Sequence, residues 1–333
     1  MSAVLALVLS AVSCKEEEDT KEYMDGTLTV DHSMPTYVQP GEKYSFTPHG
    51  ITAPDGTAVQ YYFTAPITRV SDTLKNGRTT YEYVVPDTLG TFSLSCVAYP
   101  VESSSKYYVS SSTVSFAIVS DNPARHSITG ADPQDGDEAV VIDGRTYYSR
   151  RSGGLDWLLG NLCTISRDAS GKEILGYPFR GSKAMQNIFG AYYTWEEAQK
   201  ACPPGWHLPS DAEWVGLLKS VGAPSYLEPL HSSPSGAGAL MAKASFNGSL
   251  MWDYYRDVTI TNKALGAIPT GYANIQDDGD YSFAGYLEYA VFWTADEFEG
   301  KGVYRYIFDQ YDNVFVGSAD KNSFAASVRC VRE

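Results

Sequence analysis

Two closely spaced helix-start signals, in a chain otherwise dominated by strand patterns, constrain the fold of this sequence more than any other feature. Residues 194–197 read Thr-Trp-Glu-Glu and residues 210–213 read Ser-Asp-Ala-Glu, so that a hydroxyl stands three residues before a glutamate in both. This pattern predicts a capping box, in which hydroxyl and carboxylate each accept a hydrogen bond from the other residue's amide. Apolar residues follow at helical spacing: Trp195, Ala198 and Cys202, then Trp214, Leu217, Leu218 and Val221.

Outside these two helices the sequence predicts β structure in two domains. Short alternating runs separated by turn residues fill residues 27–120 and predict a β-sandwich. Residues 121–136 are polar and contain Pro and Gly, which indicates a linker. Residues 137–333 combine the helices with strands, which predicts an α+β domain without a further helix after Ala223. A length of 333 residues also favours two cores, since one core usually stops growing at about 250 to 300 residues.

The first domain resembles immunoglobulin-like and polycystic-kidney-type repeats. The resemblance is carried by residues 81–94, which read as a strand, a Pro-Asp turn and a second strand. It implies an immunoglobulin-like β-sandwich. Cys96 alternates with Leu94 and Ala98 on one strand face, which predicts a buried free thiol.

The first residues predict export and a lipid anchor. Residues 1–13 form an apolar run that is too short to span a bilayer but suits a signal peptide. With Cys14 they resemble a lipobox, so residues 1–14 are expected to be a lipoprotein signal peptide with a lipidated cysteine. No Lys or Arg precedes Cys14, so the true start is expected upstream of Met1.

The segment after the cysteine bears on localisation. Residues 15–26 are charged and poor in apolar side chains, which predicts a tether. Its first residues, Lys-Glu-Glu-Glu-Asp at 15–19, resemble the acidic export tag of surface lipoproteins in Bacteroidetes-type bacteria. The resemblance implies an outer-membrane lipoprotein exposed on the cell surface. The alternative is a solvated linker.

Charge and motifs argue against nucleic-acid binding and catalysis. The formal net charge is −15 without a basic stripe, whereas phosphate binding needs clustered Lys and Arg. The sequence contains no G-x-S-x-G, no H-E-x-x-H and no Gly-rich phosphate loop. His207 is interpreted as a packed, hydrogen-bonded imidazole. Asp296 and Glu297 are adjacent on a strand and point to opposite faces, which does not suit a glycosidase pair. The sequence therefore predicts a protein that is not an enzyme.

Motifs in residues 137–333 together resemble the Fibrobacter-type major paralogous domain. They lie at residues 191–198, 201–214, 292–294 and 327–331, with an early strand at 157–162. That family is similar in layout to C-type-lectin-like domains, in which a cysteine on the first helix pairs with one on the last strand. The resemblance therefore implies a C-type-lectin-like fold for the α+β domain.

The resemblance also implies a disulfide between Cys202 and Cys330. The residues alone leave the pairing open, because the four cysteines beside Cys14 allow three complete pairings. The same fold family includes formylglycine-generating enzymes, which need a reactive cysteine pair. Cys163 has no obvious partner and stands in an apolar stretch without positive neighbours, which does not suit that chemistry.

In lectin-like folds the loop-rich part after the helices builds the ligand surface. The residues expected there are Trp252, Asp253, Tyr254, Tyr255, Arg256, Tyr272 and Asn274. Aromatic rings beside polar groups suit the recognition of a carbohydrate or a protein. The alternative is that these rings fill the core.

Carboxylates of the same region raise the question of a cofactor. Calcium takes about 6 to 8 oxygen ligands, and the candidates here are Asp277, Asp278 and Asp280. Residues 276–280 fit no ordered calcium template and have turn chemistry, so the sequence predicts a solvated turn and no cofactor, with calcium as the alternative.

These inferences predict a surface-anchored lipoprotein that acts as a non-catalytic binding module. It would be an adhesin or lectin-like protein for an extracellular glycan or protein, and would touch the membrane only through its anchor. The alternatives are a structural or assembly component of a cell-surface apparatus, and a polysaccharide hydrolase.

Overall fold

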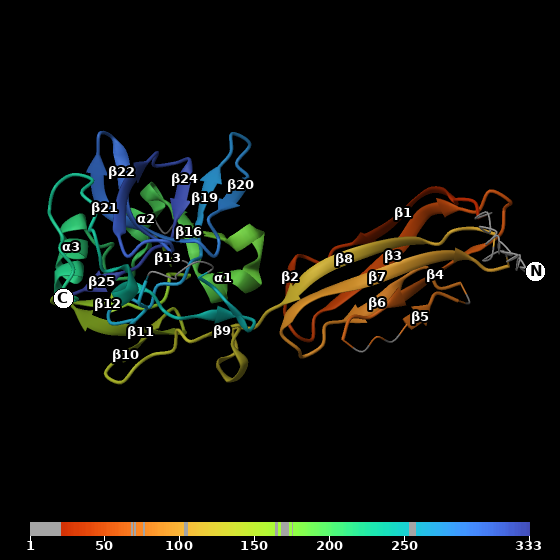
Figure 1. Ribbon diagram of the computed structural model, residues 1–333, viewed down its shortest axis with the longest axis horizontal. Helices are drawn as coiled ribbons and strands as arrows, with labels where there is room; N and C mark the ends of the chain where they lie inside the picture. Colours follow the sequence, from red (N-terminus) through yellow and green to blue (C-terminus); the bar gives the residue numbers. More distant parts are fainter. Residues whose placement is uncertain are drawn as a thin grey trace, which may run out of the picture. The chain divides into compact units, whose positions relative to one another are not determined.

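The computed structural model of the protein describes residues 21–67, 69, 71–75, 77–102, 106–163, 166–167, 173–174, 176–252 and 258–333. With 44% strand and 12% helix it is rich in β structure, as predicted (Figure 1). The contacts divide the chain into two compact units. Unit 1 comprises Met1–Ser33, Tyr44–Tyr83 and Ser93–Ser115, and unit 2 comprises Met34–Lys43, Val84–Phe92 and Phe116–Glu333.

The N-terminal strands form two sheets, ordered β1-β3-β6 and β2-β8-β7-β4-β5. Their bounds are β1 Asp25–His32, β2 Tyr37–Val38, β3 Lys43–Thr52, β4 Val59–Thr64, β5 Ser71–Thr73, β6 Tyr81–Val84, β7 Gly90–Pro100 and β8 Ser110–Ile118. Phe46 of β3 and Phe63 of β4 join the two sheets, with ring centroids 6.3 Å apart, and Tyr81 of β6 stacks on Phe63 at 4.6 Å. Cys96 of β7 is a buried free thiol, as its alternation predicts.

The described residues form five further sheets, ordered β10-β11-β12-β25, β15-β16-β24-β19-β20, β21-β22-β23, β18-β17-β9 and β13-β14. Their bounds are β9 Ile128–Thr129, β10 Glu138–Ile142, β11 Arg145–Ser152, β12 Leu155–Leu158, β13 Ser166–Arg167, β14 Glu173–Ile174, β15 Tyr177–Pro178, β16 Ala191–Thr194, β17 Ser245–Phe246, β18 Ser249–Leu250, β19 Tyr272–Ile275, β20 Tyr281–Ala284, β21 Tyr289–Phe298, β22 Lys301–Phe308, β23 Val314–Ala319, β24 Phe324–Ala326 and β25 Val331–Arg332. The strand expected at residues 157–162 ends early, at Leu158.

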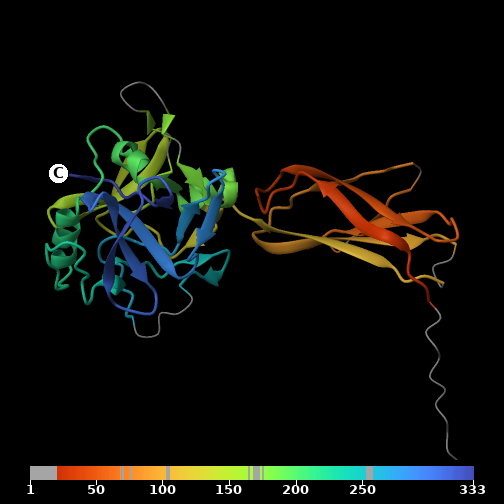
Figure 2. The same ribbon diagram turned by 90° about the horizontal axis from the view of Figure 1, so that it is seen from above.

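Both predicted helices begin with a complete capping box. In α2 (Trp195–Ala201), Thr194 Oγ1 accepts from Glu197 N at 3.2 Å and Glu197 Oε2 accepts from Thr194 N at 2.9 Å. In α3 (Asp211–Ser220), the corresponding distances for Ser210 and Glu213 are 3.3 and 2.6 Å. Helix α3 lies against β21 (Figures 1 and 2). Within the described ranges no helix is long and apolar enough to cross a bilayer.

Two short helices lack a local start signal. Helix α1 (Lys183–Phe189) has no side-chain cap. The expectation of no helix after Ala223 is wrong, because α4 (Ala237–Leu240) forms a single helical turn there. The carboxylate of Asp312 supplies the missing cap of α4, because it accepts from the amides of Gly236 at 3.2 Å and Gly238 at 2.9 Å. This acceptor lies 76 residues from Gly236, so the local sequence could not reveal it.

Candidate functional site

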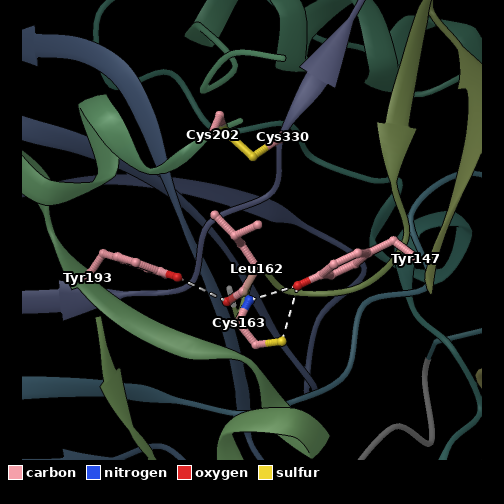
Figure 3. The surroundings of a disulfide bond; sticks show 6 residues. All are labelled: Tyr147, Leu162, Cys163, Tyr193, Cys202 and Cys330. Carbon is pink, nitrogen blue, oxygen red and sulfur yellow. Dashed lines mark hydrogen bonds between the residues drawn. A yellow bond between two sulfur atoms is a disulfide. The ribbon is translucent and has the colours of Figure 1, made fainter. Parts of the chain in front are cut away.

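A disulfide joins the residue that follows α2 to the residue that precedes β25, the last strand. Cys202 and Cys330 are bonded, with Cα atoms 5.7 Å apart and a sequence separation of 128 (Figure 3). The pairing that the family resemblance implied is therefore confirmed. Beside the bond, His207 and Val331 exchange two backbone hydrogen bonds of 2.9 Å each, so the segment that follows α2 is also held by its main chain.

The other thiol of unit 2, Cys163, is enclosed and neutral. The Tyr147 hydroxyl lies 3.1 Å from Cys163 Sγ and accepts a hydrogen bond of 3.1 Å from Cys163 N, while Tyr193 bonds the carbonyl of Leu162 (Figure 3). Burial raises the pKa of Cys163 against the opposing effects of Arg145 and Tyr147. The thiolate form that cysteine chemistry requires is thus disfavoured.

The candidate acid and base groups each have a structural partner. His207 Nε2 lies 2.7 Å from Glu213 Oε1, so the imidazole is hydrogen-bonded as expected, but 49% of its side chain is exposed and it is not packed. Asp296 accepts a hydrogen bond of 2.6 Å from the amide of Asp211. Glu297 forms an ion pair with Lys321. The two adjacent carboxylates therefore take part in two separate structural contacts.

The predicted ligand residues are placed differently from one another. Trp252 is only 2% exposed, and its Nε1 donates to the carbonyl of Ala242 at 2.9 Å. A ring enclosed in this way cannot stack on a ligand at the surface, so the core alternative applies to Trp252 and we exclude it from the site. Asp253, Tyr254, Tyr255 and Arg256 lie outside the described residues.

The carboxylates considered for calcium belong to the turn between β19 and β20. Asp278 Oδ1 accepts from the amide of Asp280 at 3.0 Å, and Gln276 N donates to the Asp280 carbonyl at 2.8 Å. Asp277 is exposed in the same turn. Over the described ranges, no group of three His, Cys, Asp or Glu side chains is arranged to hold a metal ion.

Tyr272 and Asn274 belong to a larger surface. They stand two residues apart on β19, and Asn274 is paired with Phe324 of β24, so their side chains share one face. On the neighbouring sheet, Tyr306 of β22 is paired with Phe315 of β23. We call the following set the aromatic face: Tyr272, Asn274, Tyr289, Tyr304, Tyr306, Phe308, Phe315 and Phe324.

The rings of the aromatic face form three stacked groups, which tilted contacts of Tyr306 with Tyr304 and with Tyr289 join into one array. Phe324 stacks on Tyr272 at 5.2 Å and on Tyr304 at 5.1 Å. Tyr306 stacks on Phe315 at 5.0 Å, and Tyr289 stacks on Phe308 at 4.5 Å. Each of these rings is partly exposed, and all but Phe308 and Phe315 pack against the core around the disulfide. The packing therefore orients the rings before any ligand arrives.

The polar groups of the aromatic face are available to a ligand. The hydroxyls of Tyr272, Tyr289, Tyr304 and Tyr306 have no hydrogen-bond partner in the part of the chain that the structure describes, and none is sealed from solvent. Burial raises the pKa of Tyr304 and of Tyr306, so these phenols stay protonated and can donate as well as accept. Asn274 is exposed and adds an amide.

One glycine permits this arrangement. A Cβ at Gly317 of β23 would lie 2.5 Å from Cζ of Tyr304, which is closer than atoms can approach. The ring of Tyr304 therefore lies directly over the Gly317 backbone. The sequence signal for this part of the site was the alternation Tyr304, Tyr306, Phe308 on β22, which places three rings on one strand face.

The family model described as the Fibrobacter succinogenes major domain matches residues 151–332, which include the disulfide and the whole aromatic face. No curated protein and no solved structure matches the chain.

Proposed function

We propose, from the premise that this chain belongs to the Fibrobacter succinogenes major domain family, that it is a non-catalytic binding module whose aromatic face binds glycan. The observation that supports this proposal most directly is the combination of stacked, partly exposed rings with phenol hydroxyls that have no partner among the described residues. Rings offer flat apolar area to the C–H faces of a sugar at low entropic cost, and the hydroxyls fix its orientation.

We propose that residues 137–333 have a C-type-lectin-like layout and that residues 27–120 form an immunoglobulin-like sandwich. The helix-to-last-strand disulfide Cys202–Cys330 supports the first part, and the two sheets joined through Phe46 and Phe63 support the second.

A glycan array probed with the chain from Lys15 onward, with calcium and with a chelator, tests the function. Tyr306→Ala should weaken binding of any glycan hit about tenfold, which corresponds to about 1.4 kcal/mol. Tyr226→Ala is the matched control, because Tyr226 is 49% exposed and outside the aromatic face. If the chelator abolishes glycan binding, Asp277, Asp278 and Asp280 become the first candidates for mutation.

The other outcomes of the array separate the remaining functions. Silence on every glycan would favour a protein ligand or a structural role in a surface apparatus. Release of shorter products from a polysaccharide would favour a hydrolase. A hit that Tyr306→Ala leaves unchanged would contradict the aromatic face as the binding surface.

We further propose that the protein is an outer-membrane lipoprotein anchored through Cys14 and exposed on the cell surface. Cys14→Ala should move the protein from the membrane fraction to the soluble fraction, because the acyl chains would be missing. Recovery of the variant in the membrane fraction would contradict the anchor.

A further inference from the structure

Unit 2 contains a hollow that no residue of the aromatic face lines. Its inner pocket, of about 210 Å³, is lined by residues that include His126, Arg145, Tyr148, Asn161 and Arg329. It continues into an outer groove of about 940 Å³. His126, Arg145 and Tyr148 belong to the walls of both, so the two spaces form one hollow.

Arg329 is a buried cation in the wall of the inner pocket. It is 1% exposed, and its guanidinium donates to Asn161 Oδ1 at 2.8 Å and to the carbonyls of Leu158 and Leu265 at 3.1 and 2.8 Å. Among the described residues Nη2 has no partner, although it is not sealed from solvent. Burial lowers the pKa of Arg329 to about 9, which leaves it charged at neutral pH.

The inner pocket is cationic in an acidic protein. Its lining contains Arg145 and Arg329 and not one Asp or Glu, although the chain has 40 acidic residues. Neither arginine forms an ion pair within the described ranges; Arg145 donates to the carbonyl of Asn187 and lies over the ring of Tyr147. Among the residues that the structure describes, the arginines that pair with a carboxylate are Arg78, Arg125, Arg150, Arg151, Arg305 and Arg332.

A buried charge without a counter-charge is costly, so a bound anion would supply the missing half of a pair. Arginine binds carboxylates well because its planar guanidinium presents two parallel donors. The inner pocket has room for on the order of seven waters at about 30 Å³ each, and therefore for one sugar ring.

The charged side chains of the outer groove determine which chemical groups suit the rest of the ligand. Its walls include Lys183 but also Asp132 and Asp143, both exposed. Carboxylates repel a second negative charge, whereas they accept hydrogen bonds from hydroxyl groups. The groove thus favours a neutral, hydroxyl-bearing body over a polyanion.

We propose that this hollow binds a sugar acid, with the carboxylate of a hexuronic acid paired to Arg329 and Arg145 in the inner pocket and the hydroxyl-bearing remainder in the outer groove. This site is separate from the aromatic face and does not depend on the function proposed for it.

Calorimetric titration of the full chain tests the proposal with four probes: glucuronate, glucose, acetate and inorganic phosphate. Glucose has the same ring with a hydroxymethyl group in place of the carboxylate. Glucuronate should bind at least about tenfold more tightly than each of the other three, a difference of about 1.4 kcal/mol. No glucuronate binding, or equal affinity for glucose, phosphate or acetate, would overturn the proposal.

Variants locate the site. Arg145→Gln should weaken glucuronate binding about tenfold, and it should fold, because Arg145 is only partly buried and holds one backbone carbonyl. Arg151→Gln is the matched control, since Arg151 is 59% exposed and does not line the hollow. Arg329→Lys keeps the charge but loses Nη2, the donor without a partner among the described residues, and should also weaken binding.

Tyr306→Ala separates this site from the aromatic face. It should leave the affinity for glucuronate unchanged. If Tyr306→Ala abolishes glucuronate binding, the hollow is not the site. The same conclusion follows if Arg145→Gln binds glucuronate as tightly as Arg151→Gln does.

Discussion

Removing either half of the Cys202–Cys330 bond should destabilise unit 2 by a few kcal/mol. The cysteines are 128 residues apart, and the chain-entropy model assigns a loop of that length about 5 kcal/mol at 25 °C, an upper value, with about 2 to 4 kcal/mol being typical. Cys330 is fully buried, so its replacement by Ala also leaves a small void. We expect Cys202→Ala and Cys330→Ala to lower the free energy of unfolding by amounts that agree within about 1 kcal/mol.

Tryptophan fluorescence in urea isolates the effect. All six tryptophans lie between Trp157 and Trp293, so the signal reports unit 2 alone. The two single variants and the double variant complete a double-mutant cycle, in which the double variant should lose no more than either single variant. Reduction of the unaltered protein should produce the same shift of the urea midpoint.

Additive losses in the double variant would refute the reasoning, because two residues that share one bond cannot each contribute it. Cys96→Ala serves as the matched control. Cys96 is a buried free thiol in unit 1, so this change should leave the tryptophan transition in place.

Three further predictions concern the N-cap of α3, the stability at low pH and the reactivity of the two free thiols. Ser210→Ala should lower the free energy of unfolding by about 1 kcal/mol, measured by urea denaturation, because an N-cap hydroxyl is lost. Burial acts to raise the pKa of Glu213, but hydrogen bonds from His207 and Ser210 outweigh it and lower the folded pKa below 4.5. The stability from Glu213 is therefore present above that value and lost as the pH falls through the folded pKa, so Glu213→Gln should flatten the acid limb of a stability–pH curve; an unchanged limb would count against this. Burial raises the pKa of Cys96 to about 12 and raises that of Cys163, so Ellman's reagent at about pH 8 should detect both thiols only in urea.

Local chemistry explains the features that were predictable from the sequence. The capping boxes at Thr194 and Ser210 depend on groups three residues apart, and both formed as expected. The burial of Cys96 followed from strand alternation. The Cys202–Cys330 pairing came from the family resemblance, since spacing alone left three pairings open.

The candidate site was only partly predictable. Tyr272 and Asn274 were expected at a ligand surface and lie on the aromatic face, whereas Trp252 entered the core, because a loop segment rich in rings does not reveal which rings the rest of the chain will cover. The stacking of Phe324 on Tyr304 joins strands from different sheets, and no periodicity in either strand specifies that contact.

The sequence by itself determined the high strand content, the two capped helices and the residues able to form a disulfide, because these depend on neighbours along the chain. The tertiary structure alone decided which tyrosines share a face, which carboxylate caps α4, and that Arg329 lines a pocket without an ion pair among the described residues. Those features depend on distances between residues far apart in the chain, and such distances are set only when the sheets pack together.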